Sequence, residues 1–404
     1  MRAVLLAALA AGFMAVSGLP AASADGSAGP VRVGVLTDIS GYLSSALGPP
    51  TVDAARMAAE DFGGTVLGRP IEVLGADHQN KADIGAAIAR RWFDEDQVQV
   101  ITGMGNSAVA LSVQGLAAEK NRIALFASAA STAITGKSCT RNGLHWTHDT
   151  YMFANALPKT LLAQGVDSWF LIASDYAFGR SLAEETRKVI EARGGKVVGV
   201  VYHPQGTTDF SSFLLQAQGS GAKAVAILNS GNDTVNAIKQ ASEFQITPRQ
   251  RLVVGMLLVS DAYAIGTQLG QGLEFSTIFY WNQNPEAAAF SRRFFARNKV
   301  MPTEAHAGVY SAVTHYLKAV KAAGTTDVTT VVDKMRATPV NDFYSDNLEI
   351  RADGRLMRPA YLARIKAPSQ QKEPWDLYEI VARIDPQDAF RPLAEGECPL
   401  VMKK

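Results

Sequence analysis

Small and hydroxyl-bearing residues follow two apolar runs within the stretch 98–131. Residues 103–107, GMGNS, come after the first run and open a segment with helical spacing, and residues 127–131, ASAAS, come after the second run. Unpaired backbone N–H groups at a helix start carry partial positive charge, and serine hydroxyls donate hydrogen bonds. Together these groups suit an anionic or polar part of a small ligand. We therefore interpret the stretch as one half of a binding cleft.

The elements that must position these residues are a strand at 98–101, a helix at 108–120 and a second strand at 123–126. The helix is predicted because Val109, Val113 and Leu116 recur at helical spacing. In an open α/β sheet, ligands bind beyond the carboxyl ends of parallel strands. Both turns are therefore expected at one edge of a sheet.

Two other interpretations apply to the glycines of the first turn. Residues 103–108 have the spacing G-x-G-x-x-A of a dinucleotide fingerprint, which also requires an acidic residue at the end of the next strand. The sequence has Ala127-Ser128-Ala129 there, which disfavours nicotinamide binding. The glycines also fit a tight turn with no ligand role, and this alternative stays open.

The sequence lacks the motifs of the common catalytic and metal sites. It has no G-x-S-x-G elbow, no Walker A loop, no H-E-x-x-H and no cluster of Cys and His. His145 and His148 have no obvious third ligand nearby, so we interpret them as surface or packing histidines. Asp175 and Asp233 have no carboxylate or nucleophile partner, and we expect them to cap helices. We therefore predict no enzyme activity, no catalytic residue, no metal and no cofactor.

Aromatic side chains occur in the loops expected at the strand ends. We assign Tyr42, Tyr176, Phe178 and Trp281 to ligand contact, together with Asn106 beside the first turn. With the hydroxyl groups at the same edge, they predict a cleft with apolar walls and a few polar anchors. Each aromatic side chain fits a place in the core equally well, and this alternative stays open.

The composition bounds the class of protein. At 404 residues the chain is longer than one ordinary core, which favours two domains. Lys and Arg total 39 and Asp and Glu total 38, so no net field favours nucleic acid or an anionic membrane.

The N-terminal residues 1–24 are typical of a secretory signal peptide. Arg2 precedes an apolar run at 3–19, and Ala22-Ser23-Ala24 is a small-residue ending, with cleavage expected after Ala24. We expect an exported protein in the periplasm, with no membrane insertion of the mature chain.

Cys139 and Cys398 are the two cysteines of the chain. In an exported protein, two cysteines favour a disulfide over a metal site, which needs more ligands at close spacing. The pairing would tie the C-terminal tail to a loop near position 139. Two separate thiols are the alternative.

Strands and helices alternate from position 31 to position 258, which predicts parallel sheets covered on both faces in two successive doubly wound halves. The last third differs, because helices are predicted at 286–297, 307–322 and 328–336 without new parallel strands. The segments 347–350 and 360–365, joined by the turn 352–355, predict a β-hairpin.

The order and spacing of several segments resemble the type I periplasmic binding proteins of the leucine/isoleucine/valine-binding family, the solute receptors of ABC importers. The segments are VRVGVLTDISG, ADHQNKAD, GMGNSA, ASAAST, SDYAFG and NDFYSDNLEIRADGR. The resemblance implies an α/β fold of two Rossmann-like, doubly wound lobes joined by three crossover segments, which close over a ligand. It implies an N-terminal lobe at 30–147 and 278–340 and a C-terminal lobe at 148–277 and 341–404.

The resemblance also implies site residues. In amino-acid binders of this family, a serine and an Ala-x-Thr sequence hold the ligand's carboxylate and ammonium groups. The matching residues here are Ser107, Ala129 and Ser131, and Phe178 with Tyr176 alongside matches an aromatic residue of the second lobe.

Two departures from the family pattern bear on the ligand. The acidic residue that pairs with the ammonium matches a position near Leu257, where this chain has no acid, and the second-lobe tyrosine matches Gly231 or Asn232. Burying an ammonium group without a charge partner costs roughly several kcal/mol of binding free energy. The predicted ligand is therefore a small aromatic or aliphatic carboxylate without an α-ammonium. A true branched-chain amino acid or amide binder is the alternative.

The resemblance implies a membrane partner as well. A binding protein of this kind delivers its solute to an ABC permease in the inner membrane, and we expect it to act as a monomer. A ligand-sensing module for a receptor is the alternative role.

Overall fold

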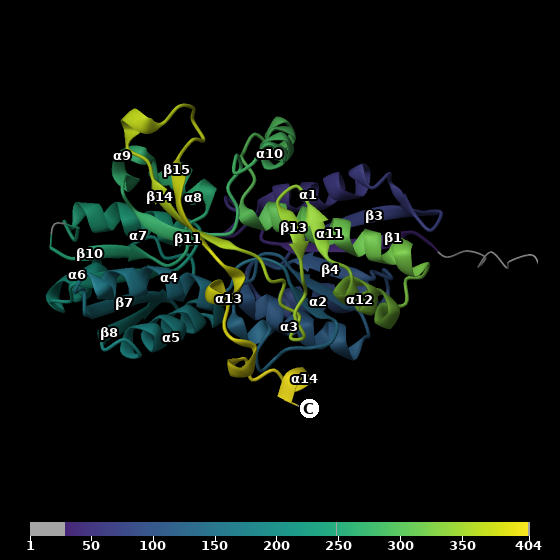
Figure 1. Ribbon diagram of the computed structural model, residues 1–404, viewed down its shortest axis with the longest axis horizontal. Helices are drawn as coiled ribbons and strands as arrows, with labels where there is room; N and C mark the ends of the chain where they lie inside the picture. Colours follow the sequence, from purple (N-terminus) through teal and green to yellow (C-terminus); the bar gives the residue numbers. More distant parts are fainter. Residues whose placement is uncertain (1–28, 248, 403–404) are drawn as a thin grey trace, which may run out of the picture.

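The computed structural model describes residues 29–247 and 249–402. The predicted signal peptide, residues 1–24, lies outside the described residues. The described chain forms two parallel sheets with helices on their faces, side by side along the long axis of the molecule (Figure 1). We call the first sheet with its helices the first lobe and the second sheet with its helices the second lobe.

The first sheet has six strands in the order β2-β3-β1-β4-β5-β6. All neighbours are parallel except the short β2, which is antiparallel to β3. The strands are β1 (Val31–Thr37), β2 (Thr65–Val66), β3 (Arg69–Asp77), β4 (Val100–Gly103), β5 (Ile123–Phe126) and β6 (Gly143–His145). The central strands are apolar on both sides because helices cover both faces.

Helices of the first lobe pack on the two faces of this sheet. One face carries α1 (Gly48–Asp61) and the later helices α11 (Glu304–Ala323) and α12 (Val328–Ala337), and the other carries α2 (Ala82–Asp94) and α3 (Ser107–Glu119). The helix α10 (Pro285–Asn298) lies beside α1 (Figure 1). The predicted strand–helix–strand unit is thus β4, α3 and β5, and residues far apart in sequence complete the lobe.

The second sheet has four parallel strands in the order β10-β9-β7-β8. They are β7 (Ser168–Ser174), β8 (Lys196–His203), β9 (Ala224–Leu228) and β10 (Arg251–Val254). The helices of this lobe are α4 (Thr150–Ala163), α5 (Ala177–Glu191), α6 (Ser211–Gly219), α7 (Asn232–Glu243), α8 (Val259–Ile265) and α9 (Thr267–Gly270). The two predicted doubly wound halves are therefore confirmed.

Two small antiparallel sheets follow. β11 (Glu274–Thr277), β14 (Ala360–Ile365) and β15 (Tyr378–Ile384) form one, and β12 (Val340–Asp342) pairs with β13 (Ser345–Leu348) in the other. The predicted hairpin of 347–350 with 360–365 is wrong, because these segments belong to different sheets. Only a single bridge, Ile350 with Leu356, joins the two arms of the turn. Strand propensity marked the segments but did not identify their partners, which lie far away in the chain.

The helix α11 holds the segments that connect the lobes. Its first residue, Glu304, contacts His148 after β6 and Thr277 at the end of β11. Two turns later, the Ser311 hydroxyl accepts a hydrogen bond from the Trp146 indole at 2.8 Å and contacts Asp342 in β12. The connecting segments therefore share one helix face, since residues seven apart lie on the same side of a helix. The lobe boundaries in residue numbers stay a prediction.

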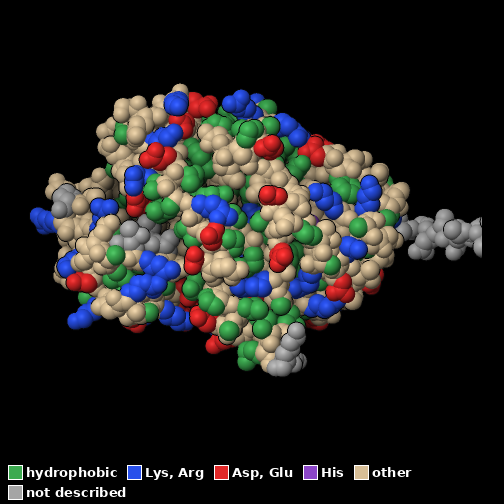
Figure 2. All heavy atoms as spheres, viewed as in Figure 1, with side chains coloured by type: hydrophobic (Ala, Val, Ile, Leu, Met, Phe, Trp, Pro, Cys, Tyr) green, Lys and Arg blue, Asp and Glu red, His purple; other side chains and the backbone are tan. Residues whose placement is uncertain are grey.

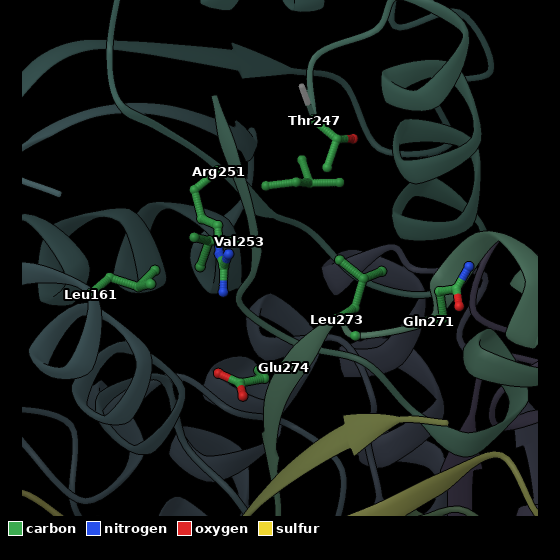
Figure 3. A pocket seen from close by; sticks show the side chains of 9 residues that line it. Leu161, Thr247, Arg251, Val253, Gln271, Leu273 and Glu274 are labelled. Carbon is green, nitrogen blue, oxygen red and sulfur yellow. The ribbon is translucent and has the colours of Figure 1, made fainter. Parts of the chain in front are cut away.

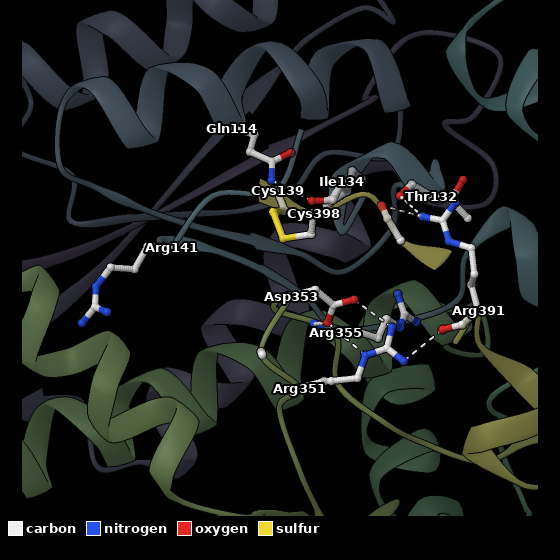
Figure 4. The surroundings of a disulfide bond; sticks show 12 residues. Gln114, Thr132, Ile134, Cys139, Arg141, Arg351, Asp353, Arg355, Arg391 and Cys398 are labelled. Atoms are coloured by element: carbon white, nitrogen blue, oxygen red, sulfur yellow. Dashed lines mark hydrogen bonds and ion pairs between the residues drawn. A yellow bond between two sulfur atoms is a disulfide. The ribbon is translucent and has the colours of Figure 1, made fainter. Parts of the chain in front are cut away.

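The C-terminal tail returns from the second lobe to the first (Figure 1). It comprises α13 (Pro386–Ala389), a single turn at Leu393–Glu395 and α14 (Pro399–Met402). A further single turn, Pro368–Gln370, lies earlier, between β14 and β15. A disulfide joins Cys398 of the tail to Cys139, with Cα atoms 5.6 Å apart (Figure 4). Nearby, the Arg391 guanidinium donates to the Thr132 carbonyl at 3.3 Å and lies 3.7 Å from Glu185 of α5. The tail therefore contacts both lobes.

The surface has no region of a single charge on the face drawn in Figure 2. Lys and Arg side chains alternate there with Asp and Glu. This agrees with the near balance of charges in the sequence and gives no attraction for a polyanion on this face.

Reducing the disulfide tests how far the tail stabilises the fold. The bond closes a loop of 259 residues, and removing such a link lowers the free energy of unfolding by about 2–4 kcal/mol. We expect a reductant to lower the urea midpoint of the mature protein. The Cys139→Ser/Cys398→Ser double variant is the control, since it should start at the lower midpoint and not respond to reductant. Equal midpoints for reduced and oxidised protein would show that the tail adds nothing.

Candidate functional site

The carboxyl ends of strands from both sheets meet at one cavity between the lobes. The loops after β1, β4 and β5 reach it from the first lobe, and the loops after β7, β9 and β10 reach it from the second. The empty space between its lining atoms, including the part open to solvent, is about 380 Å³. Its lining residues are Leu43, Ala46, Leu47, Gly105, Ser128, Ala130, His148, Tyr176, Phe178, Ser230, Met256, Leu258 and Ala305. A parallel α/β sheet places a ligand site at this edge.

Most of the cavity wall is apolar. Leu43 and Leu47 face Phe178, Met256 and Leu258 across it, and all five are buried. Among the described residues that line it, none is Asp, Glu, Lys or Arg. A ligand here loses its water shell, so each polar group on it needs a hydrogen-bond partner from the wall.

Hydroxyl groups supply most of the polar atoms of the wall. The Ser128 hydroxyl is buried and has no hydrogen-bond partner within the described part of the chain. The Tyr176 hydroxyl lies 3.4 Å from the Ser230 hydroxyl. Burial raises the pKa of Tyr176 to about 12 and raises the pKa of the adjacent Tyr42 well above its ordinary value. These phenols therefore stay protonated near neutral pH and are hydrogen-bond donors.

The turn before α3 is organised by its own side chains. Asn106 caps the helix, because its Oδ1 accepts hydrogen bonds from the backbone N–H groups of Ala108 and Val109. The Ser107 hydroxyl accepts from the N–H groups of Ala130 and Ser131 at 3.3 and 3.2 Å. Ser107 thus ties the turn after β4 to the turn after β5, and its role as a ligand contact stays a prediction.

Other predicted site residues contact neighbouring segments and do not line the cavity. The Ser131 hydroxyl accepts from the Ala133 N–H, and the Ala129 carbonyl lies 2.7 Å from the His145 Nε2 atom. Trp281 packs in the core of the second lobe, where its indole donates to the Trp375 carbonyl at 2.9 Å. Of the residues assigned to ligand contact, Tyr176 and Phe178 line the cavity itself.

Hydrogen bonds between opposing loops join the two lobes. The Ser45 hydroxyl donates to the Asn232 side-chain oxygen at 3.1 Å, and the Asn232 N–H donates to the Tyr42 carbonyl at 3.3 Å. On another side, the Asn106 amide donates to the Gln205 side-chain oxygen at 3.1 Å. Each bond joins one lobe to the other, so Asn106 and Asn232 hold the lobes together rather than line the cavity.

The structure corrects two interpretations of aspartate residues. Asp175 does not cap α5, since its carboxylate pairs with Arg180 at 2.6 Å. Asp233 does not cap α7, since it accepts from the Gly206 N–H at 3.1 Å instead. Sequence spacing places both residues near helix starts, but the direction of each side chain depends on the neighbouring loop. His145 and His148 are both buried, so of the two interpretations they are packing histidines and not surface histidines.

Sequence reasoning missed several residues that line the cavity. Ser128 and Ser230 lie in the strand-end loops that the alternation of elements predicts, so their hydroxyls carried a usable signal. His148 and Ala305 carried none, because they come from a connecting segment and from the start of a helix far along the chain.

A second hollow lies on the surface of the second lobe (Figure 3). It has a volume of about 670 Å³ and is bordered by α4, β10 and β11, with Leu161, Arg251 and Glu274 among its residues. Glu274 is already paired with Arg364 at 2.7 Å. The first lobe contributes no residue to this hollow, so closure of the lobes does not shape it.

The described residues contain neither a candidate metal site nor a candidate membrane span. Within 29–247 and 249–402, no three His, Cys, Asp or Glu side chains come together as a metal site would require. In the same ranges, no helix has the length and apolar character needed to cross a bilayer.

Comparison with known proteins agrees with this geometry. A family model described as periplasmic binding protein matches residues 30–372. A Leu/Ile/Val-binding protein homolog 6 of Brucella melitensis is 28% identical over 154 residues, which cover 38% of this chain. The match spans 39% of that relative's own length.

Solved structures match over nearly the whole chain. A periplasmic binding protein from Burkholderia mallei is 42% identical, with a TM-score of 0.90, and the match covers 93% of this chain and 100% of that one. A branched chain amino acid ABC transporter periplasmic ligand-binding protein from Burkholderia xenovorans is 38% identical, with a TM-score of 0.81 and coverages of 92% and 99%.

A third solved structure comes from R. palustris. It is a solute binding protein in complex with benzoate, 20% identical, with a TM-score of 0.79 and coverages of 89% and 97%, and it shows likeness of fold. The family model and the two lobes meeting at one cleft lead to the same conclusion: this chain belongs to the periplasmic binding protein family and has its type I, two-lobe fold.

Proposed function

We propose that this chain is the solute-binding component of an ABC importer and that it traps a small carboxylate without an α-ammonium in the cleft between its lobes. One observation carries the proposal: loops from both sheets enclose a largely apolar cavity, and its described lining residues include hydroxyl donors and no acidic side chain. The family is one of solute-binding proteins, so we expect no turnover of the ligand.

The chemistry of the wall favours a carboxylate. The hydroxyls of Ser128, Tyr176 and Ser230 are donors for carboxylate oxygens, and such charge-assisted bonds are stronger than neutral ones. Phe178 and Leu258 offer apolar surface to a ring or an aliphatic chain. An ammonium group would meet no carboxylate among the described residues of this wall. Burying such an unpaired charge costs roughly several kcal/mol of binding free energy.

Ligands of related folds support the class of solute. Three structural neighbours at 19–20% identity were solved with benzoate, 3,4-dihydroxybenzoic acid and 4-hydroxybenzoate. Each of these solutes is a small aromatic acid without an ammonium group. The neighbours show that this fold accommodates such acids, and the apolar wall of the present cleft fits one.

Asp233 favours a second candidate function, the binding of a branched-chain amino acid. Its carboxyl group is close enough to Tyr42 and Tyr176 to contribute to the raised pKa of both phenols. One of its carboxyl oxygens is buried without a hydrogen-bond partner in the described structure. Burial raises its pKa to about 7, so much of it is neutral near that pH. A ligand ammonium would ionise it. Leucine binding at pH 6 would then release a proton, whereas benzoate binding would not.

The proposal includes the compartment in which the protein acts and its membrane partner. An exported protein of this family would meet its solute in the periplasm and deliver it, as a monomer, to an ABC permease of the inner membrane. A ligand-sensing module that presents the closed form to a receptor is the alternative. Uptake of labelled benzoate by cells with and without the gene would favour transport if it depends on the gene.

Isothermal titration of the mature protein tests the ligand class. We expect benzoate to bind and leucine not to bind. Tyr176→Phe and Ser230→Ala should each weaken benzoate binding about tenfold, because each removes a donor worth about 1.5 kcal/mol to a charged group. Tyr263→Phe is the matched control, since Tyr263 is exposed and stacks on Trp375 outside the cleft. Tight leucine binding with no benzoate response would favour the second candidate.

The pH dependence of stability tests the environment of Asp233. Its folded pKa of about 7 lies above the unfolded value of about 3.9, so the folded state retains a proton that the unfolded state loses between these values. The contribution of Asp233 to stability is therefore present below about pH 4 and is lost as the pH rises to about 7. We expect Asp233→Asn to gain stability relative to wild type across this range, by roughly 1.4 kcal/mol for each pH unit at most.

Urea unfolding at pH 4.5, 6 and 8 measures this difference. Asp346→Asn is the control, because Asp346 is exposed, and its difference from wild type should stay flat. A flat difference for Asp233→Asn would contradict the buried, protonated carboxyl.

A further inference from the structure

Glu304 is a buried acid at the junction of the two lobes. It is the first residue of α11, and about 3% of it is exposed. Its partners come from two segments that leave the sheets at different places: His148 follows β6, and Thr277 and Ile278 lie at the end of β11. One carboxyl group therefore contacts two of the connections between the lobes.

The partners of Glu304 keep it ionised. Its Oε2 atom accepts from the Thr277 hydroxyl at 2.8 Å and from the Ile278 N–H at 2.9 Å, while Oε1 forms an ion pair with His148 Nδ1. Burial by itself would raise the pKa of Glu304. The charge of His148 and these hydrogen bonds outweigh burial and lower the pKa below its ordinary value. The group is a carboxylate, which accepts hydrogen bonds and donates none.

The atoms that face the two ring nitrogens of His148 favour one protonation state of the ring. Its Nδ1 atom faces the Glu304 carboxylate, and its Nε2 atom lies 3.1 Å from the Ser128 carbonyl oxygen. Both neighbours are acceptors, and only a ring with a proton on each nitrogen, an imidazolium, donates to both. The His148 side chain is fully buried.

The orientation of this ion pair matters for the cleft. His148 lines the cavity, together with Ser128 and Ala305, and Glu304 does not. The positive member of the pair thus faces the ligand space and the negative member lies behind it. In a site from which water is excluded, a charge so placed acts more strongly than it would in water.

We propose that Glu304 is a positioning residue, which holds His148 as an imidazolium in the wall of the cleft and thereby makes the cleft prefer an anion to its neutral isostere. This inference rests on the proposed function, because it names the group that selects for a carboxylate. The residue acts through His148 and not by touching the ligand. The same preference for the anion would apply to any small acid that the cavity accommodates.

Benzoate and benzamide are the probes, since they have nearly the same shape and differ in charge. We expect wild type at pH 7 to bind benzoate more tightly than benzamide by isothermal titration. Glu304→Gln removes the charge and retains the shape of the side chain, and the ratio of the two dissociation constants should fall about tenfold or more. A packing role alone would weaken both ligands equally and leave the ratio unchanged.

A second variant and a matched control accompany this measurement. His148→Gln removes the positive charge itself and should lower the ratio as Glu304→Gln does, which keeps the test informative if the buried Glu304 variant fails to fold. Glu286→Gln is the same change at an exposed position in the first turn of α10 and should alter nothing. An unchanged ratio in folded Glu304→Gln, or in folded His148→Gln, would overturn the inference.

Protonation of His148 is measured without any ligand. Nitrogen-15 NMR of protein labelled in its six histidines, with His148→Gln for assignment, reports the state of each ring. We expect both His148 nitrogens to be protonated at pH 7 in wild type and one to lose its proton in Glu304→Gln. A neutral His148 in wild type would overturn the inference. Wild type that binds neither probe but shows a doubly protonated His148 would contradict the proposed ligand class. It would leave the effect of Glu304 on the protonation of His148 supported.

Discussion

The buried carboxylate at the start of α11 is the constraint on which the arrangement of the two lobes depends. An ion removed from water is stable only where hydrogen bonds and an opposite charge replace its hydration. Glu304 finds these groups on two segments that are 129 residues apart, His148 and Thr277. Both connections must therefore reach the same helix end, and Ser311 gathers Trp146 and Asp342 two turns further along. The hinge region is thus organised from one helix of the first lobe.

The cleft follows from the direction of the strands. In each lobe the parallel strands deliver their carboxyl ends to one edge, and the helix α11 sets these two edges opposite each other. The loops that meet there bring Leu47 of the first lobe and Phe178 of the second lobe to one cavity. Asn106 and Asn232 bond to the opposite lobe, through Gln205 and Ser45. The C-terminal tail, fixed by its disulfide, crosses the same junction.

Local pattern in the sequence predicted the elements well and the long-range pairing poorly. The unit β4, α3 and β5 agrees with its prediction within about two residues, because a helical spacing of valines between two apolar runs is a local property. The predicted hairpin of 347–350 with 360–365 was wrong, since β14 pairs with β11, which lies 84 residues earlier in the chain at the closest pair, Thr277 with Tyr361. Similarly, Asp233 has the spacing of a helix cap and yet turns to Gly206, because the loop after β8 offers a backbone N–H there.

By itself, the sequence determined the class of fold, the two doubly wound halves and the strand-end loops that carry Tyr176 and Phe178. Periodicity and composition specify these features, since they depend on neighbours within a few turns or one strand. Only the tertiary structure decided which side chains share the cavity, that both ring nitrogens of His148 face acceptors and that Ser107 ties two turns together. Those features depend on burial and on partners more than a hundred residues away in some cases, and no local pattern encodes the distance between such groups.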